Sequence, residues 1–256
     1  MSDNYLKELF IDEARVAIDS RGSGGGGEAD SSFKDVLERT AVNPTLPNDL
    51  TSIGGYAFYQ CTNLALTSLP SGVTSIGDYA FYHCKNLALT SLPSGVTSIG
   101  SNAFYYCTKL ALTSIPSGVT SIGDHAFYYC TKLTLTSLPS GVTSIDTYAF
   151  YYCTNLALTS LPSGVTSIGS NAFNGCEKLA LTSIPSGVTS IGTNAFYTCP
   201  NLKSLTFEGK PATINSTAFR SCHYLTIINV PWSEGEVANA PWGATNATIN
   251  YNYTGG

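Results

Sequence analysis

The chain contains eight cysteines, and each one follows the previous one by 23 residues, from Cys61 to Cys222. Other apolar residues keep the same interval: a Leu stands three residues after every cysteine, and an Ile stands eight residues before it. Ala-Phe fills the fourth and third places before every cysteine. A fixed period of this size predicts a repeat solenoid, in which one short unit is stacked many times and equivalent apolar residues form continuous ladders.

Local signals within one unit predict how the chain turns. We count each cysteine as position 1, so that most units carry Pro-Ser-Gly at positions 10–12. Proline fixes φ and glycine tolerates positive φ, so this tripeptide predicts a corner. The preceding stretch, Leu66–Leu69 in the first unit, predicts a short strand, with stacked strands about 4.8 Å apart. The Ala-Phe-Tyr-Tyr-Cys segment predicts a single helical or 3₁₀ turn on the opposite side.

The repeat resembles a known family. The run Leu92–Gly100, followed by Ala103-Phe104, Cys107 and Leu110, is similar to the BspA-type leucine-rich repeat of bacterial surface proteins. The resemblance covers residues 45–231. It implies a leucine-rich repeat solenoid, a right-handed coil of short parallel strands with short helical/3₁₀ turns, and a role in adhesion or receptor binding.

The chain departs from that family at one position. Family members carry an apolar residue at position 7, as Leu205 and Ile228 do here. The first six units have Thr at position 7 and Leu at position 6 instead. Because side chains alternate along a strand, this leaves the register of the exposed strand face open.

The cysteine ladder has three interpretations. Stacked Cα atoms about 5 Å apart could be bridged, but stacked side chains project in parallel and a disulfide needs a crossing geometry. A metal site lacks support, because there is no Cys-x-x-Cys pair and His83, His125 and His223 are scattered. The neighbouring Phe favours something small and apolar at position 1. We therefore expect buried free thiols rather than disulfides or a metal site, and no cofactor.

The composition limits the classes of partner that the chain can bind. Charged residues make up 11% of the chain, and its net charge is −5 without a basic cluster. These features argue against nucleic acid or an anionic membrane as a partner. No apolar stretch approaches the ~18 residues of a membrane span, so we expect no membrane insertion.

The first 50 residues differ from the repeats. Residues 1–20 contain an apolar pattern at helical spacing over residues 5–18, which predicts an amphipathic helix for attachment or self-association, or else an inert leader. Charges inside it are unlike a secretory signal, so a virion or assembly in the cytoplasm is favoured over secretion. Residues 21–31 predict a Gly-rich linker, and residues 32–50 an N-terminal cap with a partial repeat.

The repeats proper occupy residues 51–231, and residues 232–256 form a different segment. Trp232 and Trp242, the two tryptophans, flank a polar loop, and Thr248–Tyr253 alternates like a strand. We interpret this segment as a C-terminal cap rather than a binding site.

Comparison among the units locates the candidate interaction surface. Variation concentrates at positions 2–3, 18–19 and 22–23, and tyrosines gather at positions 19, 22 and 23. Stacking would align them as aromatic stripes, which suit either binding or a stabilising ladder. The candidate residues are Tyr56, Tyr59, Tyr79, Tyr82, Tyr105, Tyr106, Tyr128, Tyr129, Tyr148, Tyr151, Tyr152 and Tyr197.

We expect no enzymatic activity, because only Asp124-His125 places an acid beside a histidine and no carboxylate pair or phosphate loop stands out. Three non-enzymatic functions are compatible with the sequence. The first, which the resemblance implies, is an adhesion module that binds a protein or glycan receptor through the solenoid surface. The second is a phage tail or virion component tethered by its N-terminus. The third is a passive scaffold.

Overall fold

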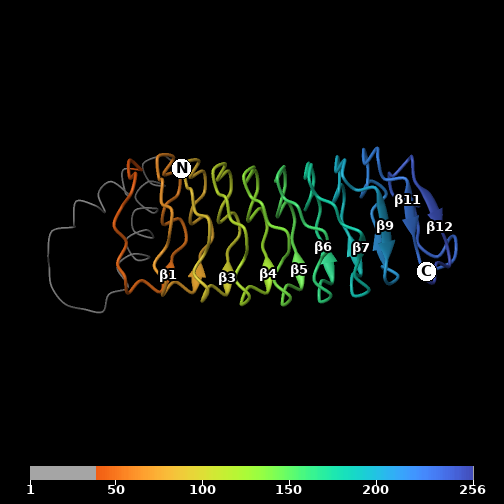
Figure 1. Ribbon diagram of the computed structural model, residues 1–256, viewed down its shortest axis with the longest axis horizontal. Coiled ribbons are helices and arrows are strands. Elements are labelled where there is room, and N and C mark those ends of the chain that lie inside the picture. The colour runs from red at the N-terminus through yellow and green to blue at the C-terminus, as the bar shows by residue number, and fades with distance from the viewer. Residues whose placement is uncertain (1–38, 256) are drawn as a thin grey trace, which may run out of the picture.

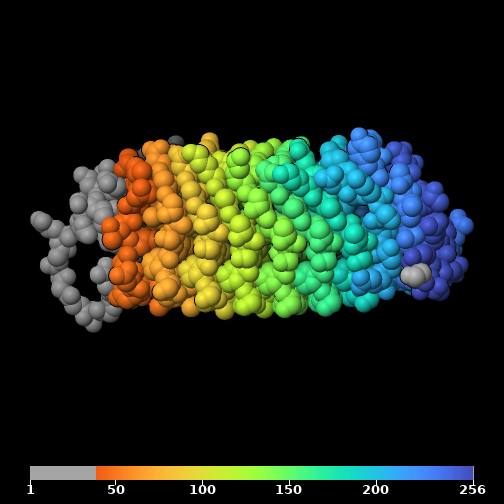
Figure 2. Space-filling model, viewed as in Figure 1, coloured from red at the N-terminus to blue at the C-terminus, as the bar shows by residue number. Residues whose placement is uncertain are grey.

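The computed structural model describes residues 39–255, which form one elongated stack of coils (Figure 1). Figure 2 shows neighbouring coils in contact along its length. The predicted helix at 1–20 and linker at 21–31 lie outside the described residues, as does the 32–38 part of the predicted N-terminal cap. None of the described segments is a helix long and apolar enough to span a membrane.

All regular structure in residues 39–255 consists of short strands. They are β1 (Ser52–Ile53), β2 (Ser75–Ile76), β3 (Ser98–Ile99), β4 (Ser121–Ile122), β5 (Ser144–Ile145), β6 (Ser167–Ile168), β7 (Ser183–Ile184), β8 (Ser190–Ile191), β9 (Ser204–Phe207), β10 (Thr213–Ile214), β11 (Ile227–Asn229) and β12 (Thr248–Asn250).

The strands occupy two places in the repeat. β1 to β6, β8 and β10 lie at positions 15–16 and pair in parallel, as where Ser52 faces Ser75 in β1 and β2. They form two sheets, β1-β2-β3 and β10-β8-β6-β5-β4. The remaining sheet, β12-β11-β9-β7, lies at the C-terminal end of the stack, where β7, β9 and β11 occupy positions 6–9. The prediction of short parallel strands in a repeat solenoid is confirmed.

The predicted strand before the proline is wrong for the first units, including Leu66–Leu69. In these units the inward residues are three apart, such as Leu112 and Ile115, and a strand places only every second residue on one face. In β9 the buried residues are Leu205 and Phe207, two apart, and the segment is a strand. The four-residue strand on this side thus forms where the apolar residue is at position 7. The preceding unit keeps Leu181 at position 6, and its strand β7 is limited to two residues, Ser183–Ile184, which pair with β9.

The segment around Ala-Phe forms consecutive turns, so the predicted helical or 3₁₀ turn is wrong. Its N–H groups alternate between two partners: Ala57 N donates to Gly54 O within the coil (3.3 Å), and Phe58 N donates to Ala80 O of the next coil (2.7 Å). The alternation uses left-handed backbone at positions 19 and 23, with φ of 58° at Tyr56 and 59° at Gln60. Such a conformation costs a non-glycine residue roughly 1–2 kcal/mol. Hydrogen bonds between coils and ring contacts offset that cost.

The hydrogen bonds between coils run in opposite directions on different sides of the stack. At the turns, Tyr56 N donates forward to Asp78 O at 2.9 Å, and the equivalent bonds repeat along the chain. On the β1 side, Thr74 N donates backward to Thr51 O at 2.8 Å. Every coil is thus joined to its neighbours by donors on both of its faces.

Phenylalanine and aliphatic ladders fill the centre of the stack. The Phe residues at position 21 are fully buried, and adjacent rings stack with centroids 5.1 to 5.6 Å apart from Phe58 to Phe219. Full burial of one such side chain contributes about 1.5–3 kcal/mol. One coil alone would leave both ring faces in water, so the core exists only through stacking.

The eight cysteines are buried free thiols, as expected. From Cys84 onward each Sγ donates to the carbonyl of the position 21 Phe in the preceding coil, for example Cys130 Sγ to Phe104 O at 3.1 Å. Burial raises the pKa of these thiols, to about 11 at Cys222, so they stay protonated and can donate. Position 1 therefore needs a small side chain that also carries a donor, a requirement not recognised from the sequence.

Proline corners form as predicted, but the glycine beside the proline has a different role. Val73 N donates to Pro70 O at 3.1 Å, and the same turn recurs in later coils. Gly72 does not adopt a positive φ. In several coils the close approach is instead at the glycine of position 17: a Cβ on Gly100 would lie 2.5 Å from Asp78 N, whereas other coils hold Asp146 or Asn215 at the same position.

One junction between coils is incomplete. β3 and β4 do not pair, and the backbone bonds that would join Thr120 N to Thr97 O and Gly123 N to Ile99 O are not formed. At the turns of the same two coils the bonds are kept, with Phe104 N 2.9 Å from Ala126 O. The stack is therefore opened locally on one side only.

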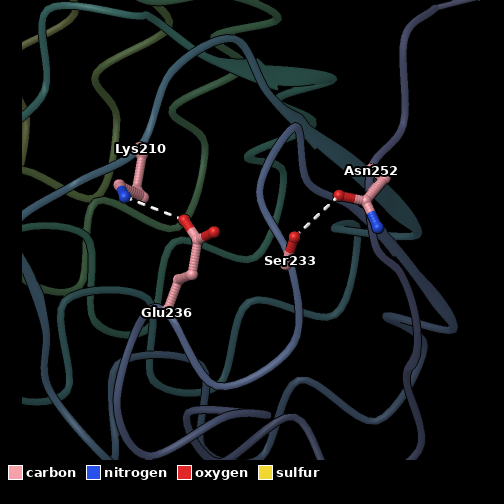
Figure 3. Close-up of polar contacts among 4 residues, drawn as sticks. All are labelled: Lys210, Ser233, Glu236 and Asn252. Atoms are coloured by element: carbon pink, nitrogen blue, oxygen red, sulfur yellow. Dashed lines mark hydrogen bonds and ion pairs between the residues drawn. The ribbon is translucent and has the colours of Figure 1, made fainter.

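The C-terminal segment completes the last coil. Trp242 is fully buried, and its carbonyl accepts from Phe219 N at 2.9 Å, as a further coil would. β12 pairs with β11 through Ile228 and Ile249. Figure 3 shows two polar contacts of the loop between the tryptophans, Lys210 Nζ to Glu236 Oε2 at 2.8 Å and Ser233 Oγ to Asn252 Oδ1 at 3.0 Å. Both tryptophans are buried, which removes them as a binding surface.

Candidate interaction surface

Tyrosine and histidine rings of five consecutive coils, those that lead into Cys61 to Cys153, lie together on the turn side of the stack. We call this set the aromatic array. It comprises Tyr56, Tyr59, Tyr79, Tyr82, His83, Tyr105, Tyr106, His125, Tyr128, Tyr129, Tyr148, Tyr151 and Tyr152. Its members come from positions 19, 22 and 23 of consecutive coils.

Position 22 supplies the longest column. Five tyrosines from Tyr59 to Tyr151 stack face to face, with centroids 4.9, 4.6, 4.4 and 4.6 Å apart and interplanar angles of 14° or less. Position 23 adds a column from His83 to Tyr152, with spacings of 4.9, 4.6 and 5.0 Å. Tilted contacts between the columns, such as Tyr128–Tyr129 at 5.3 Å, join them into one surface.

Stacking decides which part of each ring meets solvent. Inside a column both ring faces are covered by neighbouring rings, so edges and hydroxyl groups point outward. Accordingly the array tyrosines are half-buried, apart from Tyr152, which is 37% exposed. A sugar that rests on an aromatic plane needs a free face, which the interior rings do not offer. The surface can instead donate hydrogen bonds from phenols and present ring edges, which carry partial positive charge.

Four phenols of the position 22 column have a raised pKa and remain protonated around neutral pH. Burial raises the pKa of Tyr82, Tyr105 and Tyr151, and repulsion from neighbouring tyrosines raises those of Tyr82 and Tyr151 further. The pKa of Tyr128 is also raised, first by burial and then by repulsion from the neighbouring Tyr105. Hydroxyl groups at the surface are therefore neutral donors.

Two histidines belong to the array and were not among the predicted residues. His83 stacks on Tyr106 at 4.9 Å, and His125 stacks on Tyr148 at 4.7 Å. Burial lowers the pKa of both imidazoles, and Lys85 lowers that of His83 further. Their positions, 23 and 19, are those of the tyrosines, so alignment of the units would have identified them.

Tyr197 is the one predicted residue that the structure separates from the others. In the preceding unit Asn174 and Gly175 replace two tyrosines, and the columns end there. Gly175 has a φ of 72° and lies under the Tyr152 ring, which would be 2.9 Å from an added Cβ. Asn174 is buried and donates to Asn171 Oδ1 at 2.9 Å.

Two aspartates next to the array hold adjacent coils together. Asp78 Oδ1 accepts Ser101 N at 2.7 Å, and Asp124 Oδ1 accepts Thr147 N at 3.0 Å, so each carboxylate joins two coils. In the Asp124-His125 pair the imidazole is stacked on a tyrosine. Within residues 39–255, no three His, Cys, Asp or Glu side chains gather as metal ligands would.

Comparison with known proteins agrees with the geometry. The sequence matches the family described as "BspA type Leucine rich repeat region (6 copies)" over residues 30–157 and 147–239. A leucine-rich repeat protein from Bacteroides ovatus ATCC 8483 has a similar structure, with 24% identity and a TM-score of 0.61; the match covers 83% of this chain and 61% of that one. This chain thus spans less than two thirds of the Bacteroides protein.

A leucine rich cell surface protein from Faecalibacterium prausnitzii A2-165 is also similar, with 27% identity and a TM-score of 0.50 over 84% of this chain and 80% of that one. No curated protein is similar enough to count as a match. The family match covers most of the 256 residues, and the parallel-stranded coils are those expected for it. The chain belongs to the BspA-type leucine-rich repeat family.

Proposed function

We propose that this protein is a non-enzymatic recognition or adhesion module and that the aromatic array is its binding surface. The observation that supports this most is the asymmetry of the repeats. Thirteen aromatic rings gather on one side, whereas positions 7–8 and 14–15 present the same exposed or half-exposed Thr and Ser in coil after coil. Specific recognition needs a side that differs from the rest of the surface, and the array is such a side.

The physical state of the rings supports binding. Tyrosine provides a large amphipathic contact area, and few rotamers are lost when it is immobilised. Here the rings are already held between neighbours, so little further ordering would be needed on binding. Leucine-rich repeat relatives include a protein named as a cell surface protein, which supports a receptor on another surface as the partner.

A binding experiment on cells tests the proposal. Labelled full-length protein is applied to an epithelial cell monolayer, with and without prior treatment of the cells with protease or glycosidase. The triple variant Tyr106→Asn, Tyr129→Asn and Tyr152→Asn removes the three tyrosines of the position 23 column and leaves its His83, and Asn tolerates the left-handed backbone found there. The matched control is Thr90→Ala, Thr113→Ala and Thr136→Ala, which changes three exposed residues on another side.

We expect at least a tenfold loss of cell binding for the asparagine variant and none for the alanine variant. Sensitivity to protease or to glycosidase identifies the receptor as protein or glycan. Equal binding by the wild type and the asparagine variant would remove the array as the site. A scaffold role, which the mutual stacking of the rings favours, would be supported if the wild type did not bind and the asparagine variant only melted earlier.

A further inference from the structure

The position 22 column brings phenols of neighbouring coils into direct contact. Tyr82, Tyr105, Tyr128 and Tyr151 follow one another with centroids 4.6, 4.4 and 4.6 Å apart. The angle between the Tyr105 and Tyr128 planes is 6°, so the two rings lie face to face. The carbons next to each hydroxyl therefore also lie side by side at the outer edge of the stack.

We propose that this column is a site of oxidative tyrosine coupling, at which hydrogen peroxide and a haem peroxidase join phenols of adjacent coils into dityrosine. The proposal concerns a covalent modification and does not depend on the binding function proposed above.

The chemistry balances with peroxide as the oxidant. Each of two phenols gives one electron to the peroxidase and its hydroxyl proton to water, which leaves two tyrosyl radicals. A carbon–carbon bond then forms between their ortho carbons. The hydrogen on each of these carbons moves to the phenol oxygen, and the aromatic rings are restored. Two hydrogen atoms are lost in total, and one hydrogen peroxide is reduced to two waters.

The column favours coupling within one molecule. Radicals on neighbouring coils are held together by the fold, so their effective concentration far exceeds that of two separate chains. The half-exposed edges let the hydroxyl protons reach water and let radicals form by electron exchange at the surface. A small rotation of the rings changes the face contact into an edge contact, which the new bond requires.

The remaining tyrosines provide internal controls. Tyr224 is 64% exposed, yet the structure shows no aromatic ring against it within residues 39–255. Tyr197 is separated from the column by Asn174. If exposure alone decided the reaction, Tyr224 would couple first and would join separate molecules.

The spacing of the lysines allows a crosslink between Tyr105 and Tyr128 to be detected. Trypsin cleavage after Lys85, Lys109 and Lys132 puts Tyr105 and Tyr128 on two different peptides, 86–109 and 110–132. The full-length protein at micromolar concentration is treated with hydrogen peroxide and a plant haem peroxidase, and monomer and dimer are separated. Dityrosine fluorescence is recorded, and the linked peptides are identified by mass spectrometry.

We expect a fluorescent monomer that has lost pairs of hydrogen atoms, with peptides 86–109 and 110–132 joined. Because a link between coils restricts the unfolded chain, the melting temperature should rise by roughly 5–10 °C. The double variant Tyr128→Phe and Tyr129→Phe keeps the stacked rings but cannot form phenoxyl radicals at this coil, and the joined peptide should fall at least tenfold. Tyr224→Phe should leave it unchanged.

Two results would overturn the proposal. One is fluorescence confined to covalent dimers and abolished by Tyr224→Phe. The other is a folded monomer in which peptides 86–109 and 110–132 stay separate although the peroxidase oxidises added free tyrosine in the same tube.

Discussion

The thiol ladder makes a quantitative prediction at Cys130. This residue is fully buried, and its Sγ donates to Phe104 O at 3.1 Å. Cys130→Ala removes the burial of one sulfur, worth about 1 kcal/mol. It leaves a cavity on the order of 20 Å³, worth about 0.5 kcal/mol, and deletes a weak hydrogen bond worth about 0.5 kcal/mol. The Phe104 carbonyl still accepts Cys107 N at 3.2 Å, so no acceptor is left without a partner.

The expected loss in the free energy of unfolding is therefore about 2 kcal/mol. Equilibrium unfolding in urea measures it: with an m-value of about 3 kcal/mol/M, the midpoint should fall by about 0.7 M. Thr131→Ala is the matched control, because Thr131 is adjacent but lies at the surface, where substitutions change stability by less than about 0.5 kcal/mol. A cost at Cys130 no larger than at Thr131 would refute the assignment of these thiols to packing and hydrogen bonding.

Three further predictions test other parts of the fold. Burial raises the pKa of the folded thiols well above the usual value of 9.0, so their contribution to stability is complete below pH 9.0 and falls progressively as pH rises above it. Urea midpoints that stay constant to pH 10.5 would contradict this. Gly100→Ala should lower the free energy of unfolding by more than about 2 kcal/mol, because its Cβ would lie 2.5 Å from backbone. Gly95→Ala should lower it by about 1 kcal/mol or less, because the nearest atom to its Cβ is a methyl group at 3.6 Å. Equal urea midpoints for the two variants would show that the close approach is absent. Hydrogen exchange should be faster at the amides of Thr120 and Gly123 than at Thr97 and Gly100, which have the same local sequence but complete bonds; uniform protection would show that β3 and β4 pair in solution.

The repeat period predicted the architecture. The 23-residue interval and the invariant Leu, Ile, Phe and Cys were sufficient to predict a stack of coils with continuous ladders, because each of these residues packs against the equivalent residue of the next coil. Comparison of the units also identified the tyrosines of the candidate surface. Eleven of them form the aromatic array together with two histidines.

Hydrogen bonding between coils was harder to foresee. The turns at Ala57-Phe58 contain good helix signals, but their N–H groups find partners in the next coil, and local propensity does not contain that information. The strand was misplaced for a similar reason. Leu66 at position 6 instead of 7 breaks the alternation that a strand needs, and the strand of this unit is at Ser75-Ile76, a position that is paired in later units as well. The covered ring faces of the array could not be read from the sequence either, since spacing shows that rings align but not which of their faces stay open.

The opposed directions of the hydrogen bonds bear on how long a stack of coils can become. A stack without its last segment would end in unused N–H donors at the turns, of which Phe219 N is one. An open row of backbone donors is a template on which another chain can pair. The Trp242 carbonyl occupies the Phe219 donor at the C-terminal end. One backbone oxygen thus helps to limit the length of the assembly as well as to finish a fold.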